Sequence, residues 1–116
     1  MADQGKRISV AFYRSPMGAE PVREWLLSLD DAERKSIGAD IRTVEYGWPI
    51  GMPTCRSLQN GLWEVRSDLE SHRISRVIFC IVESRMVLLH GFIKKTQKTP
   101  PKDIDLALTR KKDGCL

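Results

Sequence analysis

The chain has few of the residue types from which disulfide frameworks and metal sites are built. Its 116 residues include three cysteines and two histidines. Cys55, Cys80 and Cys115 are odd in number and widely spaced, which argues against a disulfide framework. His72 and His90 take part in no Cys-x-x-Cys or His-x-x-x-His spacing, so the ligand pattern of a zinc site is missing. We therefore predict no bound metal.

Long apolar runs and phosphate-binding glycine loops are missing as well. No stretch approaches the roughly 18 consecutive apolar residues that span a bilayer, and the first residues carry no apolar export signal. Gly47 and Gly51 bracket Trp-Pro-Ile, which matches neither a Walker loop nor a dinucleotide-binding loop. We expect a cytoplasmic protein without a cofactor and without a membrane partner.

Positive charge is concentrated in the second half of the chain. The net charge is +4, and the isoelectric point is about 9.1. Residues 1–52 carry seven Lys and Arg against eight Asp and Glu, whereas residues 53–116 carry twelve against seven. This bias favours an anionic partner, with a basic solvated surface as the alternative. With 41% apolar and 29% charged residues, the composition predicts a single folded domain over residues 1–116.

Apolar periodicity and turn residues predict the order strand, helix, helix, strand, strand, strand, helix. The expected strands cover residues 8–13, 61–67, 73–82 and 86–93, and the expected helices cover residues 21–29, 30–46 and 99–112. The segment 48–61 is expected to be irregular. This order predicts an α+β fold, in which a small antiparallel sheet carries two N-terminal helices packed on it and a C-terminal helix.

Several side chains have a predictable position. Asp30 followed by Glu33 resembles a capping box at the start of the second helix, and Thr99 is the expected N-cap of the last helix. Trp25 lies on an apolar helix stripe and Trp63 on the apolar face of a strand, so both are expected in the core.

Basic residues lie in or beside the three later strands, where a purely structural sheet would have none: Arg66, Arg73, Arg76, His90, Lys94, Lys95 and Lys98. Such a set favours a surface that holds a polyanion. Strict alternation places His90 and Lys94 on one face and Lys95 on the other, and it also separates Arg73 from Arg76. These residues therefore do not all share one site.

Two arginines are the strongest candidates for function. Arg76 lies at the start of the most apolar run of the chain, where burying a charge costs free energy. A charge at such a position therefore favours a functional role. Arg66 follows Glu64 on the polar face of its strand. The alternative for both arginines is an ion pair with Glu64 or Glu83 at a strand edge.

An RNA strand can be cut without a metal ion if three chemical roles are filled. One group takes the proton of the 2′-hydroxyl, another protonates the leaving 5′-oxygen, and cations stabilise the phosphorane between them. His90 has an ordinary pKa suited to proton transfer, although it could instead be a packed histidine hydrogen-bonded to the backbone. Cys55 beside Arg56 is a weak nucleophile candidate, because one adjacent cation lowers a thiol pKa only modestly.

Three segments of the chain resemble a known family. They are Leu62-Trp-Glu-Val-Arg66-Ser, Arg73-Ile-Ser-Arg76-Val-Ile-Phe and Leu89-His90-Gly-Phe-Ile-Lys94-Lys95-Thr96-Gln-Lys98-Thr99-Pro100. Together with Pro21-Val-Arg-Glu-Trp-Leu and Tyr46-Gly-Trp-Pro, they resemble the phage-derived, HigB-like branch of the RelE/ParE toxin superfamily. The resemblance extends from about Ile8 to Arg110.

The resemblance implies the toxin of a type II toxin–antitoxin system, an mRNA interferase that acts on translated mRNA at the ribosome and is neutralised by a helix-turn-helix antitoxin. It implies that Arg66, Arg76, Lys94 and Lys95 bind and polarise the scissile phosphate, and to these we add His90 as the expected proton-transfer group because of its ordinary pKa. From their charge and their positions beside the later strands, we expect Arg56, Arg73 and Lys98 to bind RNA.

The chain departs from RelE itself in one respect. RelE uses a tyrosine near its C-terminus, whereas no tyrosine follows Tyr46 here, so His90 or a lysine would replace it. Two alternatives remain, because a shared fold does not imply a shared reaction. ParE relatives inhibit gyrase without cutting RNA, and a phage-derived RNA-binding module could have lost its activity.

Overall fold

The computed structural model describes residues 5–94 and 98–114. Its elements are β1 (Ser9–Phe12), α1 (Pro21–Leu27), α2 (Asp31–Gly47), β2 (Cys55–Ser57), β3 (Trp63–Asp68), a short 3-10 helix (Glu70–His72), β4 (Ile74–Val82), β5 (Arg85–Lys94) and α3 (Pro101–Gly114). The expected elements are all present. The expectation of an irregular segment at 48–61 is wrong for β2, because three residues are too few to produce an alternating pattern.

None of the described helices has the length and apolarity needed to cross a membrane.

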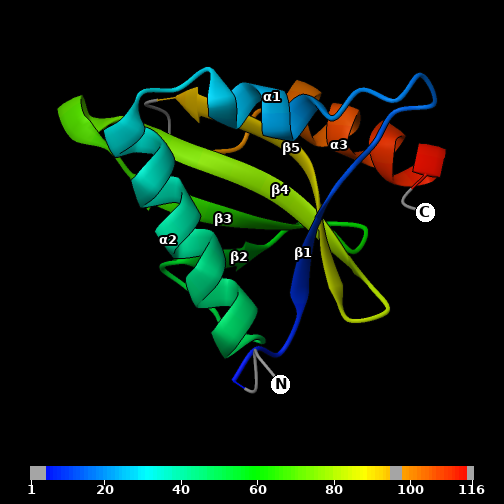
Figure 1. Cartoon of the computed structure of the whole chain (residues 1–116), viewed down its shortest axis with the longest axis horizontal. Helices are drawn as coiled ribbons and strands as arrows, with labels where there is room; N and C mark the ends of the chain where they lie inside the picture. Colours follow the sequence, from blue (N-terminus) through cyan, green and yellow to red (C-terminus); the bar gives the residue numbers. More distant parts are fainter. Residues whose placement is uncertain (1–4, 95–97, 115–116) are drawn as a thin grey trace.

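The strands form one sheet in the order β1-β5-β4-β3-β2 (Figure 1). Strands β2 to β5 pair antiparallel with their neighbours, whereas β1 runs parallel to β5. The α+β fold is confirmed, but the sheet is mixed and not purely antiparallel. The short connections between β2 and β5 keep these strands antiparallel, whereas the long connection through α1 and α2 joins β1 to β2 at the opposite edge and so does not restrict β1 to an antiparallel direction.

Helices cover both faces of the sheet (Figure 1). The two N-terminal helices pack on one face, over a core of Ile8, Val22, Ile37, Ile41, Val44, Cys55, Val65, Val77, Phe79, Met86 and Leu88. Helix α3 packs on the other face, over Tyr13, Leu62, Ile78, Cys80, Val87, Leu89, Phe92 and Ala107. Successive side chains of a strand therefore face the N-terminal helices and α3 in turn.

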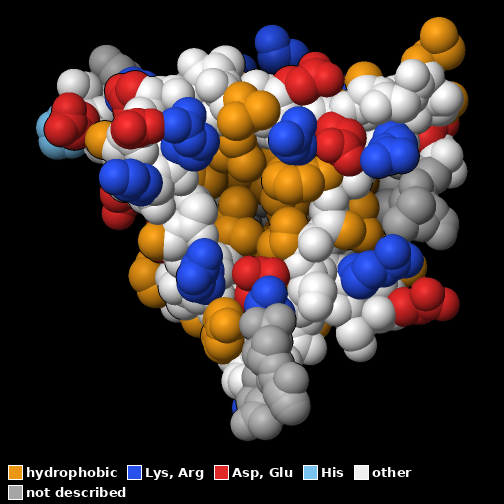
Figure 2. Space-filling view, in the orientation of Figure 1, with side chains coloured by type: hydrophobic (Ala, Val, Ile, Leu, Met, Phe, Trp, Pro, Cys, Tyr) orange, Lys and Arg blue, Asp and Glu red, His pale blue; other side chains and the backbone are white. Residues whose placement is uncertain are grey.

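The three tryptophans pack against the first core. Trp25 and Trp63 pack against it, as predicted, and Trp48 lies edge-on to Trp63 with the ring centroids 4.9 Å apart. Gly91 lets α1 approach β5 closely, because a Cβ atom at this position would lie 2.4 Å from the Trp25 ring. Figure 2 shows apolar side chains at the floor of a hollow on the face that carries α1 and α2, with charged side chains around its rim.

Of the two N-cap residues that the sequence predicts, the structure confirms only one. The Asp30 carboxylate accepts a hydrogen bond from the Glu33 backbone N–H at 2.8 Å, which confirms Asp30 as the N-cap of α2. The Glu33 side chain does not complete a capping box but binds Arg73. Helix α3 begins at Pro101, and the Thr99 hydroxyl donates to Glu64, so Thr99 is not the N-cap that the sequence predicted.

Candidate active site

Charged residues from four strands gather on the face of the sheet that α3 covers. Cross-strand register places Arg56 of β2 opposite Glu64 of β3, and Arg66 of β3 opposite Arg76 of β4. Arg76 in turn lies opposite Phe92 of β5, which belongs to the core under α3. Because residues paired across strands project to the same face, these charged side chains lie on one face of the sheet, in two neighbouring cross-strand rows.

A β-bulge turns His90 onto this face. Ile78 pairs with His90, but Phe79 pairs with Leu88, so Leu89 is an extra residue in β5. Strict alternation would place Leu89 and His90 on opposite faces. The extra residue lets both turn toward α3, where Leu89 packs into the core and His90 reaches a side chain of the helix.

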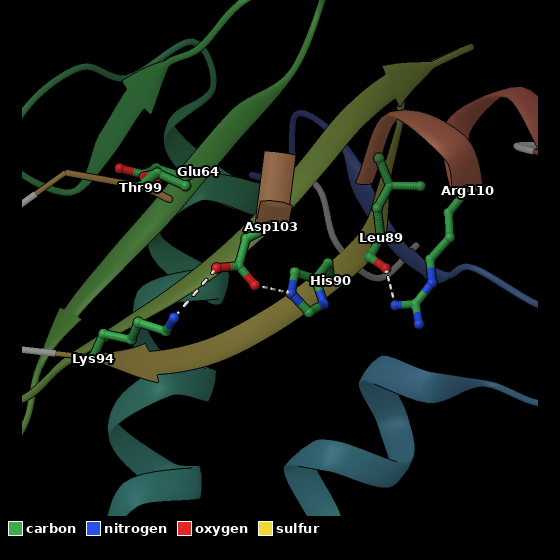
Figure 3. Close-up of polar contacts among 7 residues, drawn as sticks. All are labelled: Glu64, Leu89, His90, Lys94, Thr99, Asp103 and Arg110. Carbon is green, nitrogen blue, oxygen red and sulfur yellow. Dashed lines mark hydrogen bonds and ion pairs between the residues drawn. The ribbon is translucent and has the colours of Figure 1, made fainter. Parts of the chain in front are cut away.

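Asp103, in the first turn of α3, holds two of the predicted residues (Figure 3). Its Oδ1 lies 2.7 Å from His90 Nε2, and its Oδ2 lies 3.7 Å from Lys94 Nζ. These contacts confirm that His90 and Lys94 share a face. The partner of His90 is a carboxylate, so the alternative of a packed histidine bonded to the backbone does not describe this side chain.

The surroundings of His90 favour its neutral form. Burial lowers the pKa of His90, and the neighbouring Arg110 and Lys94 cations lower it further, while the hydrogen bond and charge of Asp103 only partly offset these effects. A neutral ring that donates from Nε2 to Asp103 carries its lone pair on Nδ1. The side chain is 15% exposed. His90 is therefore suited to accept a proton near neutral pH.

Glu64 is the second buried carboxylate of the site. It is fully buried and accepts a hydrogen bond from the Thr99 hydroxyl at 2.5 Å. The Nε atoms of Arg66 and Arg76 each lie 3.9 Å from its carboxylate oxygens. The expected alternative of an ion pair with Glu64 is therefore present for both arginines, whereas Glu83 pairs with Arg85.

The cations of the site differ in exposure. Arg76 is fully buried, and burial lowers its pKa although Glu64 opposes that change. The side chain of Arg66 is 14% exposed and that of Lys94 is 34% exposed. An anion arriving from solvent would therefore meet Arg66 and Lys94 first.

The remaining predicted residues do not all lie beside Asp103 or Glu64. Arg56 is exposed on β2, and its charge contributes to the lowered pKa of Arg76. Lys98 is exposed on the segment that leads into α3. Arg73 bonds Glu33 of α2 at 2.5 Å, which confirms its predicted separation from Arg76. Lys95 lies outside the described residues.

The thiol candidate is unsuited to nucleophilic chemistry. Cys55 is buried, and desolvation together with the charge of Glu64 raises its pKa to about 11. The neighbouring Arg56 does not overcome these effects. A thiol in this state holds its proton at neutral pH and is not a nucleophile.

The sequence did not indicate two of the site's side chains. Asp103 lies in the first turn of α3, but no local pattern relates it to His90, 13 residues away. Arg110 donates to the Leu89 carbonyl at 2.8 Å, and its guanidinium lies 5.8 Å from the centre of the Tyr13 ring. Within residues 5–94 and 98–114, no group of three or more His, Cys, Asp or Glu is arranged to hold a metal ion.

Comparison with known proteins gives a family. No curated protein matches the chain. The family model described as "Phage derived protein Gp49-like (DUF891)" matches residues 24–112, which include α2, the strands β2 to β5 and most of α3. This family is associated with RelE-like toxins of toxin–antitoxin systems, and it is compatible with a toxin-like role and with an antitoxin partner in general. The chain belongs to the phage-derived Gp49-like family.

Proposed function

We propose that this protein is the toxin of a type II toxin–antitoxin pair and cleaves translated mRNA at the ribosome, using its own side chains in place of a metal ion. The observation that carries the proposal is that His90, Lys94 and Arg66 lie on one face of the sheet, where Asp103 contacts the first two and Glu64 contacts Arg66. Metal-independent RNA cleavage requires a group that transfers protons and cations that stabilise the charge on the phosphate.

The proposed reaction is an attack of the ribose 2′-oxygen on the adjacent phosphorus. A bond forms between the 2′-oxygen and phosphorus, and the bond between phosphorus and the 5′-oxygen breaks. His90 takes the 2′-hydroxyl proton, and the Lys94 ammonium supplies a proton to the leaving 5′-oxygen. Arg66 binds the charged phosphate oxygens through paired N–H donors, with Arg56 and Lys98 holding flanking phosphates.

The proposal gives Arg76 a supporting role, whereas Arg66 binds the phosphate. Its side chain is fully buried beside Glu64, so it acts by holding Glu64 and setting the potential at Arg66. Removing one partner of a buried ion pair typically costs about 3–5 kcal/mol of stability. In an Arg76 variant, a loss of activity could not be distinguished from a loss of folding. Arg66 is therefore the better residue to change.

The partner in this proposal is a helix-turn-helix antitoxin. Association of the family with toxin–antitoxin systems supports a partner of this kind. The net positive charge of the chain also suits an acidic partner segment, which would compete with RNA for the same cations.

The test is to map mRNA 5′ ends in cells after brief induction of the wild type, Arg66→Gln and Arg42→Gln. Arg42 is an exposed cation of α2, so its substitution makes the same charge change away from the site. We expect new ends within translated frames for the wild type and Arg42→Gln, and at least tenfold fewer for Arg66→Gln. Purified variants should show equal melting temperatures.

Two results would contradict the proposal. Growth arrest without new mRNA ends would exclude the nuclease and indicate a ParE-like target such as gyrase. Cleavage by Arg66→Gln at the wild-type rate would remove Arg66 from the phosphate site.

A further inference from the structure

We infer that Asp103 is a positioning residue that holds His90 in the tautomer with hydrogen on Nε2, so that Nδ1 is the atom that takes the 2′-hydroxyl proton. This inference rests on the proposed nuclease function and goes beyond it, because it assigns His90 the role of base and names the atom. Asp103 itself would touch neither the RNA nor the reacting atoms.

The first support is the geometry of the contact. The distance of 2.7 Å between His90 Nε2 and Asp103 Oδ1 is that of a strong, charge-assisted hydrogen bond. In Figure 3 the other ring nitrogen lies on the side of the ring away from Asp103. Among the described residues, Nδ1 of His90 has no hydrogen-bond partner, so no described side chain occupies its lone pair.

The second support is that the ring cannot turn freely. The His90 ring stacks on Phe92, with centroids 5.3 Å apart and planes inclined by 26°. Asp103 is itself held, because its side chain is 10% exposed and its second oxygen faces Lys94. Ring and carboxylate therefore support one another, as a base and its orienting group do in enzymes that depend on one histidine tautomer.

The third support comes from the charges around the ring. Asp103 and Arg110 face His90 from α3, and Lys94 faces it from β5. The two cations and burial oppose a resting imidazolium, so the ring begins the reaction able to take a proton. Once the ring is protonated, the Asp103 carboxylate stabilises the new charge, and the proton returns to solvent after the product leaves.

The tautomer can be measured without any activity assay. The long-range proton–nitrogen NMR spectrum of the two histidines identifies which ring nitrogen carries hydrogen, and His72→Gln assigns the signals. We expect His90 in the wild type to be neutral with hydrogen on Nε2 at pH 7.5. In Asp103→Asn the amide can donate as well as accept, so we expect a mixture of tautomers. Asp105→Asn, an exposed change on the same helix, should leave the spectrum unchanged.

The same variants are then assayed for cleavage of a defined mRNA on programmed ribosomes. Asp103→Asn should lose about 100-fold or more in the cleavage rate at saturating ribosome concentration, with little change in half-saturation, because general base catalysis typically contributes 10²–10⁴-fold. Asp103→Glu, which restores a carboxylate, should recover part of the rate. Asp105→Asn should cleave as the wild type does, and all variants should melt cooperatively.

The outcomes separate this inference from the proposed function. A wild-type protein that leaves mRNA intact overturns the proposed function and the catalytic role of Asp103 with it. A wild type that cleaves, combined with an unchanged tautomer and rate in Asp103→Asn, overturns only the role of Asp103. A faster rate in Asp103→Asn also overturns it, since the carboxylate would then compete with the phosphate for Lys94.

Discussion

Arg66 and Arg76 lie directly opposite one another on β3 and β4, and the buried carboxylate of Glu64 lies 3.9 Å from the Nε atom of each. Like charges directly across two strands repel one another. The carboxylate compensates this repulsion, and the Thr99 hydroxyl fixes its orientation from the segment that leads into α3. The proposed phosphate site and the fold of the sheet therefore depend on the same acidic side chain.

The first prediction concerns this carboxylate. Glu64→Gln removes the charge that compensates two arginines, one of them fully buried, and we expect the free energy of unfolding to fall by about 3 kcal/mol or more. Urea denaturation measures the change. Glu83→Gln is the control, because Glu83 is 84% exposed on a turn and its loss should change stability by no more than about 0.5 kcal/mol. Equal midpoints for the two variants would show that Glu64 does not stabilise the arginine pair.

The second prediction concerns two glycines with opposite surroundings. Gly91→Ala places a Cβ atom 2.4 Å from the Trp25 ring and should destabilise the protein by about 1–3 kcal/mol. Gly38→Ala, in the middle of α2, meets nothing within 4 Å and should stabilise it by about 0.5–1 kcal/mol, because alanine is the better helix former. Thermal unfolding should shift in opposite directions. A Gly91→Ala variant as stable as the wild type would contradict the close packing of α1 on β5.

The third prediction is a pH dependence of stability from His90. Its pKa in the folded protein lies below the ordinary value of about 6.5, so the unfolded chain binds the proton more readily. The contribution of His90 to stability is therefore fully present above about pH 6.5 and is lost as the pH falls through the lower pKa of the folded state. In His90→Gln, the free energy of unfolding should depend less steeply on pH below about 6.5. An unchanged slope in that variant would assign the dependence to other groups.

The fourth prediction concerns thiol reactivity. The pKa of Cys55 is raised to about 11, and both Cys55 and Cys80 are buried. In a Cys115→Ser variant, folded protein at pH 8 should therefore take up almost no iodoacetamide, whereas protein in urea should take up two equivalents. Mass spectrometry of intact protein distinguishes the two results. Rapid labelling of the folded variant at Cys55 would show an accessible thiolate and would restore it as a nucleophile candidate.

Local signals were sufficient for most of the secondary structure. Alternation correctly separated the apolar Trp63 and Val65 from the polar Glu64 and Arg66, and Asp30 correctly marked the start of α2. Alternation also placed His90 and Lys94 on one face, where both meet Asp103. These results depend on the periodicity of strands and helices and on contacts between residues close in sequence.

The sequence by itself thus determined the α+β order of elements, the basic character of the second half and the faces of most side chains. Only the tertiary structure decided that β1 runs parallel to β5, that Arg76 is buried against Glu64, and that Asp103 meets His90. The bulge at Leu89 illustrates the reason. One extra residue in a strand reverses the face of every residue after it, and whether it occurs depends on packing between elements distant in the chain, which no local pattern contains.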